Sequence, residues 1–303
     1  MRALVTGATG FVGHRLLGHL ESPVVLSRDG GKAEHDLARF AVKGFSWNPQ
    51  AEPPPAAAFE GVDTVIHLAG EPVASGLWTS AKKVRLRDSR IAGTRNLVAT
   101  LGKLPVKPKV LVSASAVGYY GDRGDEVLDE SAAPSSDFLG EVCQGWEREA
   151  LAAQAFGIRV VIIRVGIVLG EKGGALAKML TPFYLGAGSP LGNGRQYMAW
   201  IHIEDLVRIM LFAAEHHAVS GPLNGTAPNP VTNRQFTRTL GRVLRRPTFL
   251  PAVPGFMLRL MLGEVSSILL NSQRAIPQAA EQAGFKFAYP QLEGALDNIF
   301  RRR

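Results

Sequence analysis

A glycine-rich turn near the amino terminus is the strongest constraint on how this chain can fold. A short apolar run over 3–5 precedes the turn, and a helical pattern over 11–20 follows it. A turn between a buried strand and a helix is typical of a dinucleotide-binding unit, where the diphosphate lies at the amino-terminal end of the helix. The turn reads Thr6-Gly7-Ala8-Thr9-Gly10-Phe11-Val12-Gly13.

The three glycines of the turn are spaced as G-x-x-G-x-x-G, and each has its own physical role. The first permits a tight turn, the second lets the main chain approach a pyrophosphate, and the third lets the helix pack closely on the strand. A glycine turn without a ligand is the alternative interpretation. The predicted cofactor contacts in this segment are Gly7, Thr9, Gly10, Phe11, Val12 and Gly13.

Apolar runs alternate with helical patterns through the first two thirds of the chain. The helical patterns include 80–101 and 137–155, and the second places Phe138, Val142, Trp146 and Ala150 on one face. The runs that predict buried strands are 3–5, 24–26, 64–66, 110–112 and 160–163. Continuous apolar strands between helices predict an α/β fold of the Rossmann type, with a doubly wound parallel sheet covered on both faces.

The residue composition changes at two places along the chain, and these changes suggest where its domains begin and end. Three glycines and a proline lie between Ala187 and Gln196, and helical segments separated by prolines follow Pro247. We predict a dinucleotide-binding domain over 1–230, with a substrate-side loop inserted at about 173–196. A small, mainly helical module is predicted over 247–298.

The charge balance bears on the class of partner. The chain has 34 basic and 26 acidic residues, a net charge of +8, and its densest basic cluster is 301–303. The sequence contains no recognisable nucleic-acid motif, so we attribute the excess to solvated surface and a phosphate site. Binding to nucleic acid is the weaker alternative and would depend steeply on salt.

Cysteine content and hydropathy bear on location. Cys143 is the only cysteine, which excludes an intramolecular disulfide and a cysteine-rich metal site. No apolar run approaches the roughly 20 residues that a membrane span needs. The first residues lead directly into the glycine turn and do not resemble a signal peptide. We therefore expect a cytoplasmic protein without a membrane partner; its oligomeric state stays open.

The end of the second predicted strand bears on the choice between NAD and NADP. NAD-binding versions of this unit have an acidic residue there that accepts hydrogen bonds from the ribose 2′-hydroxyl. This chain has Ser27 and Arg28 instead, and Asp29 lies one residue beyond. A guanidinium suits a 2′-phosphate because its planar donors bind two phosphate oxygens. We predict NADP(H), held by Ser27 and Arg28; a surface arginine at a strand end is the alternative.

The end of the strand over 64–66 adds further cofactor contacts. Small residues there let the main chain lie against the adenine-ribose half of a dinucleotide, which predicts contacts from Leu68, Ala69 and Gly70. His67 by itself is more typical of a satisfied core histidine than of a catalyst.

With these segments placed, the chain resembles the extended short-chain dehydrogenases/reductases, the family of sugar-nucleotide epimerases and dehydratases. The resemblance covers about 230 residues and includes 6–13, 67–70, 93–97, 113–121, 164–170 and 200–206. The remainder is similar to an atypical epimerase-like branch, through Ser89-Arg90, 138–147 and a tail over 249–296. That tail looks like the branch's carboxyl-terminal module of unknown function, and the branch's substrate is generally unassigned.

The resemblance implies a catalytic serine but not the rest of the usual machinery. The family moves a hydride with a Ser or Thr and a Tyr-x-x-x-Lys pair, whose lysine lowers the tyrosine pKa. Ser115 falls at the serine position. The tyrosine-lysine pair is absent, and the closest counterparts by spacing from Glu147 are Leu139 and Cys143. Neither of these side chains relays a proton as tyrosine and lysine do.

Several side chains are candidates to replace the missing pair. Tyr119 and Tyr120 follow the serine strand, and Glu141 lies on the helix that should carry the pair. The alternatives are loop packing for the tyrosines and a solvated helix face for Glu141. Cys143 fits a buried apolar position better than a reactive one.

The resemblance also places two residues near the cofactor: Arg90 close to the phosphates and Val168 close to the nicotinamide. The rest of the basic stretch over 82–90 is expected to be a solvated helix face. His202 is either structural or lines the mouth of the substrate site.

Two functions remain open from the sequence. The first is an NADP(H)-dependent oxidoreductase or sugar-nucleotide epimerase-like enzyme. It would act on a small polar substrate with a carbonyl or hydroxyl group, covered by the loop at 173–196 and the carboxyl-terminal module. The second is a non-catalytic protein that binds or senses NADP(H), which the loss of the Tyr-x-x-x-Lys pair favours.

The role assigned to Arg28 gives a first prediction. Replacing it (Arg28→Ala) removes the guanidinium expected at the 2′-phosphate, so NADPH binding should weaken by about tenfold or more, at least about 1.4 kcal/mol. NADH lacks that phosphate, and its affinity should be nearly unchanged. Calorimetric titration with both cofactors checks this, and equal losses for the two would defeat the assignment.

Overall fold

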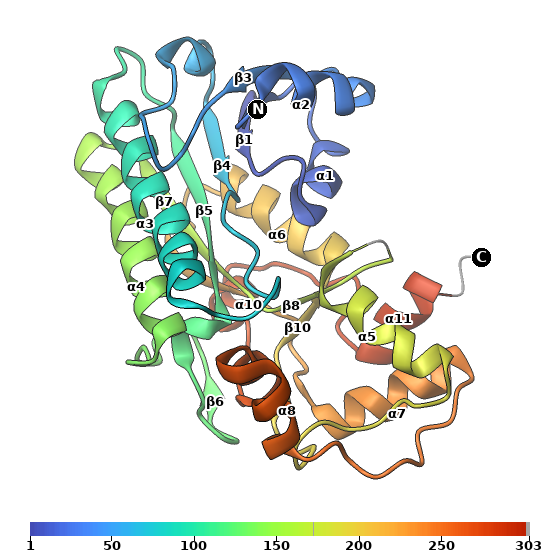
Figure 1. Cartoon of the computed structure of the whole chain (residues 1–303). Helices are drawn as coiled ribbons and strands as arrows, with labels where there is room; N and C mark the ends of the chain where they lie inside the picture. Colours follow the sequence, from blue (N-terminus) through green and yellow to red (C-terminus); the bar gives the residue numbers. More distant parts are fainter. Residues whose placement is uncertain (172, 301–303) are drawn as a thin grey trace.

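Seven parallel strands form the central sheet, in the order β11-β7-β5-β4-β1-β2-β3 (Figure 1). This computed structural model describes residues 1–171 and 173–300, so the basic cluster at 301–303 lies outside the described residues. The strands are β1 (Ala3–Thr6), β2 (Val24–Ser27), β3 (Lys43–Ser46), β4 (Thr64–His67), β5 (Val110–Ala116), β7 (Arg159–Val165) and β11 (Gly221–Gly225).

Helices cover both faces of the sheet. On one face lie α1 (Phe11–Leu17), α2 (Gly30–Asp36) and α6 (Ile203–Glu215), and on the other α3 (Ser80–Lys103) and α4 (Phe138–Leu151). Successive strand residues alternate between the two layers, as Leu4 packs toward α3 and Val5 toward α1. The predicted α/β, Rossmann-type fold with a doubly wound parallel sheet is therefore confirmed.

All five predicted strands are present, and the face of α4 that includes Val142, Trp146 and Ala150 is buried as expected. The two edge strands, β3 and β11, were not predicted. Their sequences are rich in glycine and polar residues and poor in β-branched ones, so they have little strand propensity of their own. Each forms because a neighbouring strand offers unpaired main-chain groups at the edge of the sheet.

The last third of the chain is largely helical, as expected. It contains α7 (Asn233–Leu244), α8 (Gly255–Leu262), α9 (Ser267–Leu270), α10 (Gln278–Gln282) and α11 (Leu292–Phe300). Helix α7 shares a core with α11, where Phe236 and Leu240 meet Ala295 and Leu296. The segment between the two predicted domains therefore packs on the second of them.

The substrate-side segment at 173–196 is not entirely a loop, which corrects our expectation. Its first half forms α5 (Gly174–Tyr184), because Ala, Leu, Lys and Met favour a helix and Leu176 and Phe183 bury against α7 and α11. The glycines that suggested a loop lie after Tyr184.

Among residues 1–171 and 173–300, none of the helices combines the length and the apolar character that a membrane span requires.

Short elements complete the structure. The two-residue and three-residue strands pair as β8 (Ile167–Leu169) with β10 (Trp200–His202), β9 (Tyr197–Met198) with β12 (Val231–Thr232), and β6 (Val127–Leu128) with β13 (Arg274–Ala275). Single 3-10 turns lie at Ala38–Phe40, Ala56–Phe59, Val117–Tyr120, Ala152–Phe156 and Gly263–Ser266.

Two positions of the glycine turn tolerate no side chain. Gly7 has φ +70°, and a Cβ there would lie 2.8 Å from the carbonyl carbon of Leu68. At Gly13 a Cβ would lie 2.3 Å from the carbonyl oxygen of Gly7. Real Cβ atoms do not approach this closely, so the main chains of β1, α1 and the segment after β4 meet directly.

This close approach predicts the cost of one methyl group. Gly13→Ala should lower the free energy of unfolding by about 2 kcal/mol or more, because the backbone must move to accept the Cβ. Gly18→Ala is the matched control at the exposed end of the same helix, where φ is −66° and the nearest contact is 3.4 Å. It should change stability by less than about 1 kcal/mol. Urea unfolding checks both, and equal losses would contradict the packing described.

Candidate cofactor and substrate site

The predicted cofactor segments lie together at the carboxyl end of the sheet. Strand β1 pairs with β2 and β4, and Thr6 lies opposite Leu26 on one side and His67 on the other. The glycine turn, the Ser27–Arg28 corner and the 68–70 segment therefore leave the sheet side by side. In open parallel sheets, ligands bind at this edge.

The amino-terminal end of α1 is not capped by the protein. Gly10 is the N-cap residue, and no side chain makes a hydrogen bond there. Phe11, the first residue of the helix, lies against the segment after β8, since a Cβ at Gly174 would stand 3.0 Å from both its ring and the Val168 carbonyl oxygen. Phe11 and Val168 thus border the same place, as expected if both line one ligand.

At the end of β2, the carboxylate that follows Arg28 in the sequence already has a structural role. The side chain of Asp29 accepts a hydrogen bond from the Lys32 main-chain N–H at 2.9 Å and caps α2. Arg28 is exposed. The corner thus presents a guanidinium to a ligand, while the aspartate that follows it stabilises a helix end.

His67 is a core residue, as predicted. It is fully buried, with Nδ1 2.7 Å from Thr6 Oγ1 and Nε2 3.0 Å from Thr94 Oγ1. Thr6 Oγ1 also accepts from the N–H groups of Leu68 and Ala69, so its own proton is donated to Nδ1. Burial lowers the pKa of His67 to about 4. The neutral imidazole therefore fixes the 68–70 segment against β1.

Arg90 lies beside the 68–70 segment without a carboxylate partner in the described part of the chain. Its guanidinium donates to the carbonyls of Leu86 at 3.1 Å and Glu71 at 3.0 Å, and stacks over the Trp146 ring. A Cβ at Gly70 would lie 3.1 Å from Arg90 Cζ. Burial lowers the pKa of Arg90. The charge of Glu71 acts on Arg90 without a direct ion pair among the described residues, and a buried cation of this kind favours an anion at this point.

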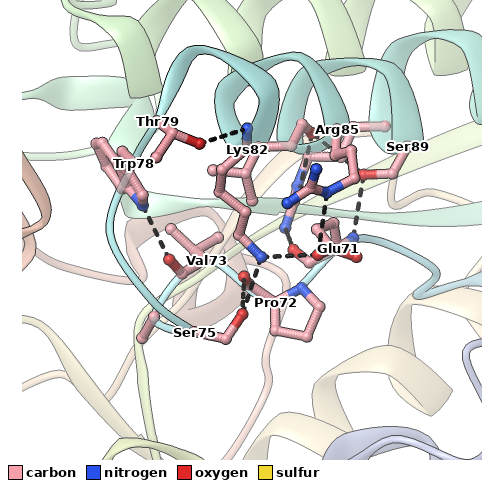
Figure 2. A network of polar contacts seen from close by, with 12 residues as sticks. Glu71, Pro72, Val73, Ser75, Trp78, Thr79, Lys82, Arg85 and Ser89 are labelled. Atoms are coloured by element: carbon pink, nitrogen blue, oxygen red, sulfur yellow. Dashed lines mark hydrogen bonds and ion pairs between the residues drawn. The ribbon is translucent and has the colours of Figure 1, made fainter.

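We expected most of the basic stretch at 82–90 to be a solvated helix face. Lys82 departs from this expectation, because it is only 5% exposed. Figure 2 shows its Nζ donating to Glu71 Oε1 at 2.7 Å and Ser75 Oγ at 2.9 Å. The hydrogen bond from Lys82, with its charge and that of Arg85 and Arg28, holds the pKa of Glu71 below its usual range. These contacts anchor the loop after β4 on α3.

Ser115 is held by a buried ion pair. Its Oγ donates to Glu147 Oε1 at 2.6 Å, and the Glu147 carboxylate is bound by Arg164 through Nε at 3.0 Å and Nη2 at 2.9 Å. Burial works to lower the pKa of Arg164, but the hydrogen bonds and charge of Glu147 outweigh it and raise that pKa. Two-point binding of this kind fixes the orientation of both groups.

The two tyrosines after β5 differ in their surroundings. The Tyr120 hydroxyl is buried, 2.8 Å from Asn224 Oδ1, and accepts from Arg164 at 3.0 Å; burial raises its pKa to about 12. Tyr119 is half-buried, with Arg164 Cζ 3.6 Å from its ring centroid. Its hydroxyl has no hydrogen-bond partner among residues 1–171 and 173–300.

Helix α4 presents Cys143 and Glu147 to Ser115, but not Glu141. The Cys143 thiol is buried, with Ser115, Glu147 and Arg90 as polar neighbours, and burial raises its pKa to about 11. Leu139, one turn earlier, lies against Gly118. Glu141 is exposed. It lies two positions before Cys143, and side chains two positions apart on a helix point about 200° apart. The structure does not bring Glu141 to Ser115.

His202 is structural rather than part of a substrate mouth. It is 3% exposed, its Nδ1 accepts from the Glu204 N–H at 3.1 Å, and its ring lies 4.0 Å from that of Tyr289. The imidazole therefore caps the start of α6.

A cavity of about 550 Å³ opens beside the amino-terminal end of α4. Its walls come from three distant segments: Trp78 after β4, Phe138 and Leu139 on α4, and the region from Arg259 to Asn271. Sequence reasoning had placed Phe138 and Leu139 on this helix and the carboxyl-terminal module over the substrate, but it missed Trp78 and the individual residues between Arg259 and Asn271 that line the cavity. No local pattern signals them, because the cavity exists only where the carboxyl-terminal helices meet the sheet domain.

Comparison with known proteins agrees with the fold. Residues 3–224 match the NAD dependent epimerase/dehydratase family, and residues 253–299 match a domain of unknown function. An epimerase family protein of Arabidopsis thaliana, a chloroplastic SDR39U1 homolog, is 41% identical over 99% of this chain and 87% of its own length.

Solved structures point the same way. The human epimerase family protein SDR39U1, solved with NADPH, has a TM-score of 0.88 and 32% identity, with both chains fully covered. UDP-glucuronic acid 4-epimerase from Bacillus cereus, solved with UDP-glucuronic acid and NAD, shares the fold at a TM-score of 0.79. Its identity is only 16%, over 99% of this chain and 98% of its own.

Burial of His67 makes a prediction about pH. The pKa is 6.5 in an unfolded chain and about 4 in the folded protein, so the unfolded chain binds a proton first as the pH falls. The stability that this difference contributes is complete above about pH 6.5 and is lost toward about pH 4. Between about pH 7.5 and pH 5 the loss should be about 2 kcal/mol.

The control for this prediction is His67→Gln, which cannot titrate. Urea unfolding of both proteins at the two pH values isolates the contribution of the imidazole from that of other acids. The natural protein should lose about 2 kcal/mol more than the variant. The same pH dependence in both would show that His67 is not held neutral.

Proposed function

The chain belongs to the NAD dependent epimerase/dehydratase family, and on this premise we propose that it is an NADP(H)-dependent oxidoreductase acting on a small carbonyl or hydroxyl compound. The cofactor would lie along the carboxyl edge of the sheet. The substrate would lie between that edge and the carboxyl-terminal helices.

The observation on which the choice of NADP(H) rests is the corner after β2. Arg28 is exposed there, and Asp29, the carboxylate that follows it, is engaged in capping α2. A carboxylate facing the ribose would select NAD; a guanidinium favours the additional phosphate of NADP. The NADPH bound by the human relative supports the same choice.

The remaining cofactor contacts follow from the geometry of the edge. The uncapped first turn of α1 would receive the diphosphate, with the Arg90 cation nearby. The 68–70 segment would lie against the adenosine half, and Phe11 and Val168 would border the nicotinamide. The nicotinamide, when bound, supplies or accepts the hydride.

The chain's own part in the chemistry is to orient the substrate and move a proton. We assign orientation to Ser115, whose hydroxyl oxygen is fixed by Glu147 and whose lone pairs remain for a hydrogen bond. We assign proton donation to Tyr119, because its hydroxyl has no partner in the described part of the chain. Glu141 receives no step, because it lies on the exposed side of α4. Leu139 and Cys143 supply an apolar wall that excludes water.

One observation favours a second function, a non-catalytic NADP(H)-binding or sensing protein. Leu139 and Cys143 stand where the family has its tyrosine and lysine, and the Ser115 hydroxyl already donates its proton to Glu147. Under this alternative, Ser115→Ala changes no measurable turnover, whereas the bound cofactor changes how the protein engages a partner.

The location also remains a proposal. We expect the protein to work in the cytoplasm, where its buried thiol, Cys143, would stay reduced. The charge balance leaves nucleic acid outside this proposal.

Turnover separates the two functions. With NADPH and a panel of ketones, quinones and sugar nucleotides, the natural protein should oxidise NADPH with at least one compound. Tyr119→Phe should lower kcat by about 100-fold or more while the Kd of NADPH stays unchanged.

The matched control for Tyr119→Phe is Tyr184→Phe, at a 49% exposed position of α5, which should behave like the natural protein. NADPH that binds tightly but is never oxidised supports the non-catalytic alternative. Full activity in Tyr119→Phe would remove Tyr119 from the mechanism.

A further inference from the structure

We propose that the cavity beside α4 is the substrate site and that it takes a planar-ring carbonyl compound with at most one negative charge, rather than a nucleoside diphosphate sugar. The inference rests on the proposed function, since it names the substrate class of that enzyme. Its volume of about 550 Å³ is within the range of small-molecule sites.

The walls of the cavity are built to pack against a ring. The rings of Trp78 and Phe138 meet edge to face, with centroids 5.4 Å apart and planes 63° apart. Leu139 and Leu270 extend the apolar surface. The Trp78 indole N–H donates to the Val73 carbonyl at 3.0 Å, so tryptophan offers the cavity a ring rather than a donor. Aromatic walls of this kind favour offset or edge-on contact with a planar ligand.

The charges around the cavity do not suit a diphosphate. Asp137 and Glu264 border it as carboxylates, and Arg259 is the one cation that lines it among the described residues. Lys83, beside the Phe138 ring, is ion-paired with Glu264. A diphosphate would therefore meet the Asp137 carboxylate, the Lys83–Glu264 ion pair and one exposed guanidinium, which together carry no net positive charge to bind it. A like charge such as that of Asp137 also disfavours an anionic ligand.

The polar groups that remain suit a single carbonyl or carboxylate. The hydroxyl of Ser266 donates to the main-chain carbonyl of Gly263 at 2.6 Å, and that of Ser267 donates to the carbonyl of Glu264 at 2.8 Å. The side-chain amide of Asn271 and the guanidinium of Arg259 have no partner within the described residues. One or two donors on an otherwise apolar wall fix the orientation of one oxygen atom without stabilising a large anion.

The wall that contains Trp78 is held rigid by the contacts of Figure 2. Buried Lys82 links Glu71 to Ser75, and the Thr79 hydroxyl caps α3 by accepting from the Lys82 main-chain N–H. The loop is therefore fixed at several points around Trp78. A wall that is already in place costs a ligand little ordering entropy.

The cavity also adjoins the proposed chemistry. Leu139 lines it and stands at the position of the family's tyrosine, one helical turn before Cys143, which contacts Ser115. A ring against Leu139 would lie one helical turn from Cys143, the neighbour of Ser115. A nicotinamide bordered by Phe11 and Val168 would approach from the sheet edge.

Calorimetry on the NADPH-loaded protein tests the proposal with two probes. We expect 2-acetonaphthone, an uncharged ring ketone, to bind about 100-fold more tightly than UDP-glucose. Phe138→Ala should weaken the ketone by about tenfold or more, through loss of the aromatic wall. The matched control is Phe256→Ala, on the 68% exposed face of α8 outside the cavity, which should leave the affinity within about twofold.

A charge variant adds an independent check. Arg259→Glu should leave the affinity for 2-acetonaphthone within about threefold but weaken 2-naphthoate by about tenfold or more. NADPH affinity, measured in the same samples, reports whether each variant is folded and loaded. If the natural protein did not bind NADPH, the proposed function itself would be wrong.

Three outcomes overturn the substrate proposal while NADPH binding stands. UDP-glucose binding more tightly than the ketone would restore a sugar nucleotide as the ligand. Equal effects of Phe138→Ala and Phe256→Ala would place the ketone elsewhere. Failure of both ring probes to bind would mean that the cavity is not a site for this class.

Discussion

The direct contact of main chain on main chain at the glycine turn is the constraint on which the rest of the structure depends. Gly13 sits on the carbonyl of Gly7, and Gly7 on that of Leu68, at distances where a methyl group would overlap. The contact draws α1 onto β1 and the end of β4. Because Gly7, Gly10 and Gly13 have no side chains, an anion can approach the main-chain amides of the turn.

The arrangement around the turn is reinforced by one buried side chain. The Thr6 hydroxyl accepts hydrogen bonds from the amides of Leu68 and Ala69 and donates to His67, so the last residue of β4 and the two residues after it are fixed relative to β1. Arg90 then lies against Gly70, hydrogen-bonded to two carbonyls and stacked on a tryptophan ring, with the charge of Glu71 nearby. A neutral imidazole and a buried guanidinium thus occupy neighbouring places, and only the second offers charge to a cofactor.

A second buried centre, the Glu147–Arg164 pair, connects the carboxyl end of the sheet to the carboxyl-terminal helices. Arg164 donates to the Tyr120 hydroxyl, and that hydroxyl donates to Asn224 Oδ1. The side-chain amide of Asn224 in turn donates to the carbonyl of Ile276 at 2.8 Å. The Glu130 carboxylate accepts from the amides of Asn224 at 2.8 Å and Ala279 at 3.1 Å. Removing one member of a buried pair costs about 3–5 kcal/mol, so the pair of Glu147 on α4 and Arg164 on β7 holds Ser115 in a fixed position.

The sequence was informative where a local pattern dictates the local structure. The five apolar runs became strands, and the turn between 7 and 13 has the shape that its glycines require. It was uninformative where partners come from far along the chain. Lys82 is buried because Glu71 and Ser75 lie across the loop, and β3 and β11 exist only through their neighbours. The cavity joins Trp78 to Arg259 and Asn271, a separation that no periodicity records.

The most direct measurement of the central claim is a crystal structure of the protein with NADPH. The account predicts diphosphate oxygens within hydrogen-bond distance of the main-chain amides at the start of α1, and the 2′-phosphate against the Arg28 guanidinium. A diphosphate bound away from the Gly7–Gly13 turn, or a 2′-phosphate directed into solvent away from Arg28, would contradict it.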